Sequence, residues 1–289
     1  RPWRQGLPQS IDAWEGLPLS DPSETLARLS FQRFFRFFRK LGGMSGTARE
    51  AADELWHIYE LPVLSVPTNN PCIRKVLPSR FYPDQKSKWQ AICDEVDACH
   101  ETGQPVLIGT RSVAVSETFA GLLRERNIAF QLLNAVKHRE EAKIIASGGQ
   151  AGAVTIATNM AGRGADIKLG KGVAELGGLH VVVSERHESG RIDRQLCGRC
   201  SRQGDPGSVR IYASLEDELL LQYGPKRFLK LLLQTISGNR PESNHLVDHL
   251  ISLAQQKAQR QAYRQRQIVM QTDDWLTDAL SFARSELDQ

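Results

Sequence analysis

The sequence predicts an α/β fold, in which a parallel sheet has helices on both faces and a helical region follows it. Two observations lead to this prediction. Apolar segments rich in β-branched residues alternate with helical patterns up to residue 213, and after Asp217 only helical patterns remain. Alternation of this kind is typical of βαβ units, whose parallel strands are buried on both faces. The expected strands are residues 106–109, 130–133, 154–157, 179–183 and 209–213.

The N-terminal part is expected to be helical. Asp21 provides an N-cap for a helix over residues 21–41, which ends at two glycines. This helix is unusually aromatic, and its rings cover more than one face. The aromatic positions are Phe31, Phe34, Phe35, Phe37 and Phe38. We expect these rings to pack in a core, and docking into a partner's groove is the alternative.

Three further segments complete the expected organisation. A second helix passes through Trp56 and Tyr59, and residues 67–71 form a linker because two prolines disfavour regular structure. A long polar helix is expected at about 245–289. It carries a basic stripe, which we interpret as a solvated face because glutamines rather than aromatic residues lie between the basic residues. The stripe consists of Lys257, Arg260, Arg264 and Arg266.

Composition excludes several classes of protein. The 289 residues carry a net charge of only +4, which argues against nucleic acid as the main partner. No apolar run approaches the roughly 20 residues that a membrane-spanning helix needs. The five cysteines are scattered and odd in number, so we expect reduced thiols and interpret the Cys197 to Cys200 spacing as incidental.

The most informative segment is QLCGRCSRQGD, at residues 195–205. Arg199 and Arg202 are three residues apart, so both guanidinium groups can leave one face of a helix and reach the same polyanion. In nucleotide-driven motors such an arginine neutralises charge that develops on the transferred phosphoryl group. The alternative is a solvated basic turn.

A second segment, TIATNMAGRGAD at residues 155–166, places a glycine-rich turn directly after an expected strand. Gly164 allows a ligand to approach the backbone, and Asp166 can either accept hydrogen bonds from a sugar or hold an arginine in place. Ligands of open α/β sheets bind at the carboxyl ends of the strands, so we expect these loops and the two arginines at that edge.

Other candidate sites are rejected. Glu185 and His187 do not converge on a metal at their spacing, and no second ligand follows at the required distance, so we expect no metal site. No serine, histidine and aspartate set has independent support as a catalytic triad. The sequence also contains no Gly-x-x-x-x-Gly-Lys-Ser/Thr loop, so it lacks a phosphate cradle of its own.

These two segments resemble motifs V and VI of superfamily 2 helicase-type motors. Their amino-acid sequences are similar to those of the same motifs in the SecA family of protein-translocating ATPases. Residues 1–217 carry the resemblance almost without interruption, and the remainder is similar mainly in being helical. The matching blocks are residues 3–16, 43–48, 66–71, 73–75, 103–110, 153–170, 177–180, 185–189, 191–193 and 195–217.

The resemblance implies an organisation and a function. Residues 1–66 would close the first nucleotide-binding lobe and carry its coupling motif at 44–48. Residues 67–220 would form the second motor lobe, with the RecA-like parallel sheet of helicase-type P-loop NTPases, and residues 221–289 would begin a helical scaffold. ATP would bind between the lobes, with Mg²⁺ held by the absent P-loop lobe. The implied partners are that lobe, an unfolded preprotein and a membrane channel, with no nucleic acid. The implied location is the cytoplasm, with peripheral attachment to the membrane.

The resemblance also assigns roles to individual residues. Arg202 would be the arginine finger and Arg199 its companion, while the nucleotide-contacting or nucleotide-sensing positions would be Asp205, Gly164, Asp166, Gln195 and Gly204. The fragment by itself is expected to show no ATPase activity, because hydrolysis requires both lobes that enclose the ATP.

Three positions depart from the family pattern and leave open a weakened or regulatory form. Ser201 replaces a glycine, Ala165 replaces a threonine, and Cys197 replaces an arginine. If Ser201 requires a positive φ, the serine costs on the order of 1 kcal/mol. Two alternatives therefore remain: the second lobe of a nucleic-acid helicase, which would show salt-dependent binding to single strands, and a non-catalytic interaction module.

Overall fold

The computed structural model describes residues 7–18, 29–133, 141–158, 166–225 and 245–287. The chain divides into two compact units, one made of residues 1–42 and 266–289 and the other of residues 43–265. The predicted sheet and the predicted arginine segment belong to the second unit. The division expected from the resemblance, at residues 66 and 220, remains a proposal.

The described helices of the first unit are short at its N-terminal end. They are α1, Leu7–Trp14, and α2, Phe31–Arg36. Ser30 has an extended backbone, with φ of -72° and ψ of 156°, and its hydroxyl caps α2 by accepting a hydrogen bond from the Arg33 amide at 3.1 Å. The prediction of one continuous helix over residues 21–41 is therefore wrong, because the chain is extended at Ser30. Asp21 lies outside the described residues.

The predicted core packing of the phenylalanines is also wrong. Phe31 is 80% exposed and Phe37 is 66% exposed, and none of the five rings is buried. Phe34 packs edge-on against Phe35 and Phe38, with ring centroids 5.4 Å apart in both pairs. Phe34, Phe35 and Phe38 thus contact one another, and the Phe37 ring lies under the Arg33 guanidinium, 5.9 Å from the ring centroid.

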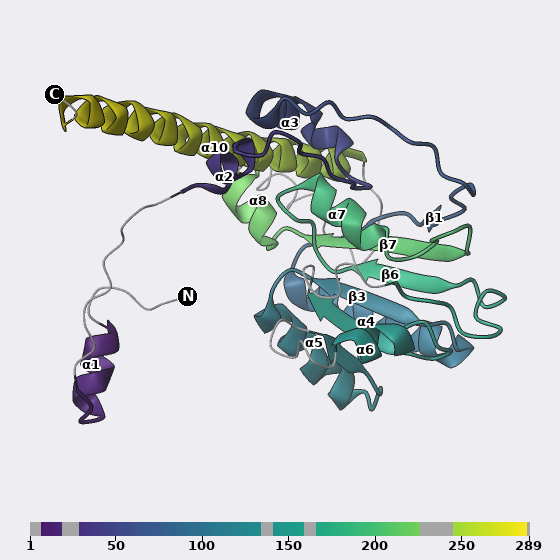
Figure 1. The fold of residues 1–289 in the computed structure, drawn as a ribbon. Helices are drawn as coiled ribbons and strands as arrows, with labels where there is room; N and C mark the ends of the chain where they lie inside the picture. Colours follow the sequence, from purple (N-terminus) through teal and green to yellow (C-terminus); the bar gives the residue numbers. More distant parts are fainter. Residues whose placement is uncertain (1–6, 19–28, 134–140, 159–165, 226–244, 288–289) are drawn as a thin grey trace. The chain divides into compact units, whose positions relative to one another are not determined.

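The second unit is built on a parallel sheet with the strand order β1, β7, β6, β3, β5, β4, and β2 also pairs with β7 (Figure 1). The strands are β1 Lys75–Val76, β2 Arg80–Tyr82, β3 Val106–Thr110, β4 Gln131–Leu133, β5 Val154–Thr158, β6 Leu179–Val183 and β7 Gly207–Ser214. All five predicted strands are confirmed. The structure adds β1 and β2, which are too short and too close to prolines to give a strand pattern.

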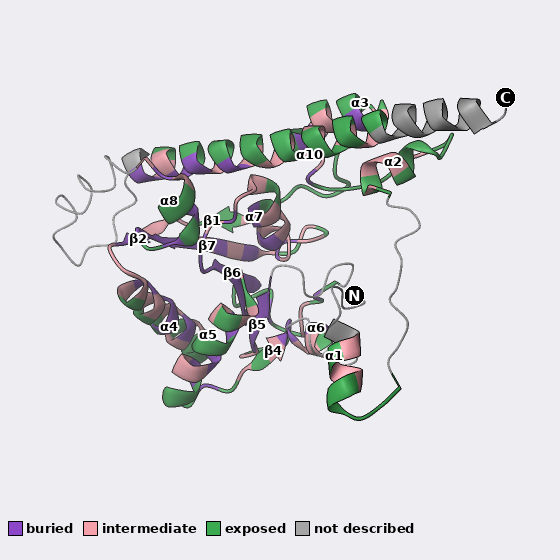
Figure 2. Ribbon diagram, turned by 90° about the vertical axis from the view of Figure 1, so that its left-hand side faces the viewer, coloured by how far each residue is buried: buried purple, intermediate pink, exposed green. Residues whose placement is uncertain are grey.

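The central strands of the sheet contribute side chains to two cores, one on each face, as the buried β-branched pattern requires. Val106 and Ile108 belong to the core that α4, Gln85–Thr102, and α5, Val113–Glu125, cover. Leu107 lies between them in sequence and belongs to the opposite core, with α6, Glu141–Ser147, and α7, Gly190–Cys197. Figure 2 shows the buried strands between these layers. The predicted fold class is confirmed.

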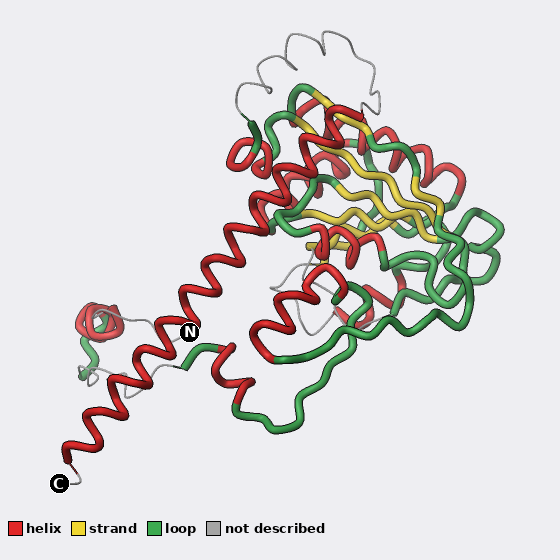
Figure 3. The backbone as a smooth tube through the Cα atoms, turned by 90° about the horizontal axis from the view of Figure 1, so that it is seen from above, coloured by secondary structure: helices red, strands yellow, loops and turns green. Residues whose placement is uncertain are grey.

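The remaining helices of this unit lie before and after the sheet. The 3-10 turn Arg49–Ala51 leads into α3, Ala52–Tyr59, and α8, Glu218–Tyr223, follows β7. The long helix α10, His245–Leu287, begins in this unit and continues into the other (Figure 3). The expected helices through Trp56 and near residue 245 are confirmed.

Within the described residues, the helices are either too short or too polar to span a membrane. The five cysteines carry free thiols, as predicted. His180 of β6 is buried, and its ring lies 2.7 Å from the Ser208 hydroxyl of β7 and 3.0 Å from the Glu95 carboxylate of α4.

Candidate functional site

Helix α7 leads into the arginine segment and lies close to the sheet. It ends at Cys197, so Arg199 and Arg202 lie in the turn after it, and the prediction that they share one face of a helix is wrong. A Cβ atom at Gly109 of β3 would be 2.1 Å from the Leu196 side chain, so only a glycine allows Leu196 to pack directly on that strand. Leu196 is buried among the apolar side chains of β3, β6 and β7. The contact between Leu196 and the sheet therefore sets the distance between α7 and the strands. It also sets the position at which the turn of residues 198–206 begins.

The turn lies at the amino end of the strands, not at the carboxyl end. It connects the C-terminus of α7 to Gly207, the first residue of β7. A Cβ atom at Gly178, directly before β6, would be 1.9 Å from the Pro206 carbonyl oxygen. The prediction that the arginines lie at the carboxyl edge is therefore wrong, because α7 runs back along the sheet before the turn begins.

Arg202 is held by contacts on two sides. Its Nε donates a hydrogen bond to the Gly198 carbonyl oxygen at 3.0 Å, and Nη1 lies 2.8 Å from the Asp166 carboxylate. Both side chains of this ion pair remain more than one third exposed. Of the two roles considered for Asp166, the structure shows the holding of an arginine. The guanidinium is thus oriented at the surface rather than buried in an internal pair.

The other predicted site residues are only partly brought together. Arg199 is half-buried beside Leu196 in a narrow cleft between α6, β5 and α7, and Asp205 is exposed at the end of the turn. The Gln195 side chain donates to the Thr47 hydroxyl at 3.2 Å, so its described contact is with the chain's own loop. Gly164 and Ala165 lie outside the described residues.

The backbone of the turn adopts an uncommon conformation. Ser201 has φ of 55°, Gln203 has φ of 54° and Gly204 has φ of 89°. The Asn70 amide, from the predicted linker, donates to the Gln203 carbonyl oxygen at 2.9 Å, and a Cβ atom at Gly204 would be 3.2 Å from Asn70. Gly204 therefore serves close packing against Asn70. Its assigned contact with a nucleotide stays a prediction.

Ser201→Gly is expected to stabilise the second unit. The positive φ disfavours an L-residue by about 1 to 2 kcal/mol, and the extra freedom of glycine in the unfolded chain returns about 0.4 to 1 kcal/mol. We expect a net gain of roughly 0.5 to 1 kcal/mol in the free energy of unfolding, measured by urea denaturation. Gly103→Ala, at φ of 77°, is the opposite control and should destabilise. A Ser201→Gly variant less stable than the original chain would contradict the assigned strain.

The carboxyl ends of the strands hold a cluster of charged side chains that pair with one another. Lys88 and Asp217 form a buried ion pair, and Arg111 lies 2.8 Å from Glu188 and 3.2 Å from Glu218. Burial raises the pKa of Glu185, which lies among these charges. Among the described residues, no group of histidine, cysteine and acidic side chains could hold a metal ion.

The thiols next to the arginines are poorly suited to reaction. Burial raises the pKa of Cys197 to about 11, and it also raises the pKa of Cys200. Because the thiolate is the reactive form, neither group is activated at neutral pH.

Two of the residues that contact the predicted site lie far from it in sequence. Thr47 belongs to the block that the resemblance marks as a coupling motif. Asn70 belongs to the predicted linker, which is also one of the blocks that carry the resemblance, but no contact with the arginine turn was expected for it. Neither contact has a local sequence signal, since the partners Gln195 and Gln203 are 148 and 133 residues away.

The sequence is similar to known protein families over most of its length. A family model described as the SecA P-loop domain matches residues 71–175 and 170–238, which together exceed half of the chain, and a model described as the SecA DEAD-like domain matches residues 4–56. The chain belongs to the SecA family. Its similarity to curated SecA proteins extends over almost the whole sequence.

Two SecA relatives show the extent of the similarity. "Protein translocase subunit SecA 2" of Chlorobium chlorochromatii is 49% identical over 286 residues, which are 99% of this chain and 43% of the relative. The protein of the same name from Magnetococcus marinus is 48% identical over 280 residues, which are 96% of this chain and 42% of the relative. The chain therefore spans less than half the length of these SecA proteins.

Among solved structures, the Escherichia coli DEAD-box protein SrmB, crystallised with the regulator RraA, is similar with a TM-score of 0.41 and 21% identity. The similarity covers 50% of this SecA-family chain and 83% of SrmB.

Proposed function

We propose that this chain supplies one wall of the ATP site of a SecA-type motor that moves unfolded preproteins through a membrane channel. The observation that carries the proposal is the state of Arg202, whose guanidinium is oriented by Gly198 and Asp166 at an exposed surface. The sequence contains no phosphate-binding loop, so the arginine would act on a triphosphate held by another lobe.

The chemistry of the side chains fits a phosphate group in this position. Arg199 and Arg202 present planar guanidinium groups, which bind phosphate oxygens through paired hydrogen bonds. The described residues provide no carboxylate cluster for Mg²⁺, so its ligands are assigned to the P-loop lobe. Magnesium-bound ATP, when present, supplies the transferable γ-phosphoryl group. Arg202 would then neutralise charge on that group, and Asp166 would keep the arginine in position.

The structure offers a route by which the site could respond to other parts of the motor. Gln195 of α7 contacts Thr47, and Arg194 of α7 lies 2.7 Å from Glu50. Both partners belong to the segment that the resemblance assigns to the first lobe. Movement of that segment would therefore reach α7 directly, and α7 leads into the arginine turn.

Complementation tests this function. The 289-residue chain is mixed with a P-loop lobe produced from a SecA protein such as the Chlorobium chlorochromatii relative, and magnesium-dependent ATP hydrolysis is measured. We expect negligible turnover by either part and a clear gain on mixing. Substantial turnover by the chain alone would overturn the proposal, and so would the absence of any gain. Salt-dependent binding of single-stranded RNA or DNA would instead favour the helicase alternative.

A further inference from the structure

Asp193 lies at the centre of a polar network that the proposed chemistry does not use. It stands in the first turn of α7 and is 2% exposed. One carboxylate oxygen accepts a hydrogen bond from the His187 amide at 2.9 Å and lies 2.7 Å from the His187 ring. The other carboxylate oxygen lies 3.4 Å from Arg186. The acid thus ties the start of α7 to the loop that precedes it.

Gln255 of α10 completes this network. Its side-chain amide donates one hydrogen bond to the Asp193 carboxylate at 2.7 Å and another to the His187 carbonyl oxygen at 2.8 Å. An amide group has two N–H donors, so both are used. One side chain of α10 therefore binds the first turn of α7 and the loop before it.

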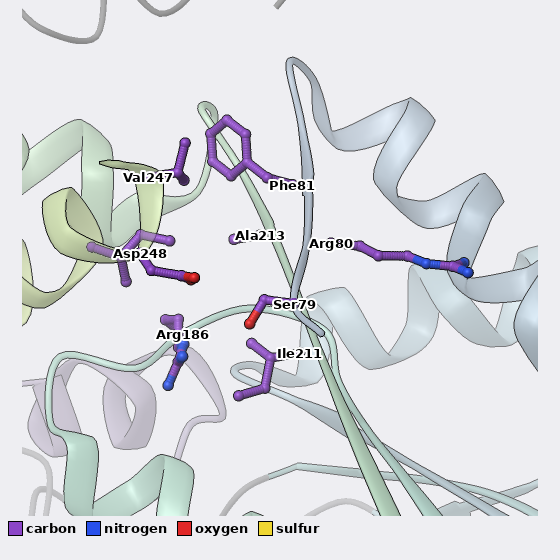
Figure 4. A pocket seen from close by; sticks show the side chains of 9 residues that line it. Ser79, Arg80, Phe81, Arg186, Ile211, Ala213, Val247 and Asp248 are labelled. Atoms are coloured by element: carbon purple, nitrogen blue, oxygen red, sulfur yellow. The ribbon is translucent and has the colours of Figure 1, made fainter. Parts of the chain in front are cut away.

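The N-terminal part of α10 is firmly seated in the same unit, which gives Gln255 a fixed origin. Val247, Ile251, Ala254 and Ala258 recur at helical spacing, and all four are buried against side chains of β2, β7 and α8. Figure 4 shows Val247 next to Phe81 of β2, at one side of a small cavity that Arg186 lines at the other. Helix α10 thus forms a stable platform beside the β6–α7 loop.

We propose that Gln255 is a positioning residue that attaches α7, and therefore the Arg199–Arg202 turn, to helix α10. The consequence for ATP hydrolysis rests on the proposed function, whereas the attachment itself does not. Helix α7 has only eight residues, about 12 Å of length, so a contact in its first turn sets the direction of the whole helix. A hydrogen bond to a buried carboxylate is also stronger than a neutral one.

Hydrogen exchange on the 289-residue chain tests the attachment. Gln255→Leu removes both donors, and we expect roughly tenfold faster exchange for amides of residues 187–205, as for the loss of two hydrogen bonds. Amides of β3 should be unchanged and serve as the internal reference. Gln256→Leu is the matched control, because Gln256 is the exposed neighbour. Unchanged exchange in Gln255→Leu, or an equal increase in Gln256→Leu, would overturn the proposal.

Exchanging the donor at residue 255 with the acceptor at residue 193 distinguishes the loss of this specific contact from a general loss of stability. Gln255→Glu places a second carboxylate beside Asp193 and should accelerate exchange at least as much as Gln255→Leu. Adding Asp193→Asn restores one donor and one acceptor in reversed order, while the new amide oxygen can still accept from His187. The bond to the His187 carbonyl oxygen is not rebuilt, because a glutamate carboxylate cannot donate to it. We therefore expect the double variant to recover part of the protection that Gln255→Glu loses, through the rebuilt contact between residues 255 and 193. Failure to recover it would overturn the proposal, also in the case where Gln255→Leu unfolds the chain.

The effect on the arginines is measured as the ATPase kinetics of the 289-residue chain mixed with the P-loop lobe. Gln255→Leu should lower kcat about tenfold and leave the KM for ATP nearly unchanged, because a displaced arginine affects the transition state more than the bound substrate. An unchanged kcat together with faster exchange would overturn the role in positioning the arginines. If the original pair shows no ATPase activity, the proposed function fails, and the exchange result still decides the attachment.

Discussion

Arg202→Lys is expected to lower the magnesium-dependent ATPase rate of the complemented pair by roughly 10³-fold or more, the range found for arginine fingers. Lysine keeps the positive charge but loses the planar fork, so it cannot bind Asp166 and a phosphate oxygen in fixed directions. The KM for ATP should change little, because the contact is strongest when charge develops in the transition state. Steady-state kinetics over a range of ATP concentrations measures both values.

Two further variants show whether the loss belongs to the arginine finger. Arg126→Lys changes an ion-paired arginine, 2.7 Å from Asp94, that lies after α5 and is covered by neither α7 nor the turn. It should retain the original rate. Asp166→Asn keeps an acceptor for Arg202 but removes the charge, so we expect a smaller loss of about tenfold, or roughly 1.4 kcal/mol. If the Arg202→Lys chain, mixed with the P-loop lobe, hydrolyses ATP as fast as the original chain does, Arg202 is not the arginine finger.

Lys88→Met is expected to destabilise the second unit by about 3 to 5 kcal/mol, the cost of leaving one member of a buried ion pair without its partner. The side chains of Lys88 and Asp217 are 2% and 3% exposed. Asp217 also accepts hydrogen bonds from the Ser214 amide at 2.8 Å and the Ser214 hydroxyl at 2.6 Å. Without the ammonium group, the Asp217 carboxylate would lose its cationic partner at the buried end of β7. Denaturation in guanidinium chloride measures the effect.

Matched variants isolate the ion pair from the loss of a lysine as such. Lys86→Met changes an exposed lysine of the same helix and should cost less than about 0.5 kcal/mol. Adding Asp217→Asn to Lys88→Met removes the unpaired charge and keeps an acceptor for Ser214, so much of the loss should be recovered. If Lys86→Met and Lys88→Met cost the same, the buried pair is not what stabilises this end of the sheet.

Much of the fold follows from local patterns in the sequence. The strands β3, β5 and β6 are buried along their whole length, so each is a run rich in β-branched residues that is visible without a structure. The edge strand β4 is exposed at Gln131, and β7 is buried at only six of its eight positions, so their patterns are weaker. The strands β1 and β2 have two and three residues, too few for any periodicity. The helix expected from Asp21 onward fails at Ser30, where a second capping residue starts α2 instead.

The candidate site was predictable in its residue types but not in its arrangement. The spacing of Arg199 and Arg202, and the acid at Asp166, were sufficient to suggest an arginine finger and its holder. The prediction that the arginines lie at the carboxyl edge of the sheet was wrong. The loops directly after the strands lie at that edge, whereas the arginine turn follows α7, which runs back along the sheet, and ends at the start of β7.

The sequence by itself determined the parallel α/β class, the positions of the buried strands and the identity of the arginine segment, because each depends on residues close together in the chain. The tertiary structure decided which distant side chains hold that segment: Asp166 for Arg202, Asn70 for the turn and Gln255 for α7. These contacts join residues 36, 133 and 62 positions apart. Hydrogen bonds between single polar side chains leave no periodic pattern, so only folding brings the partners together.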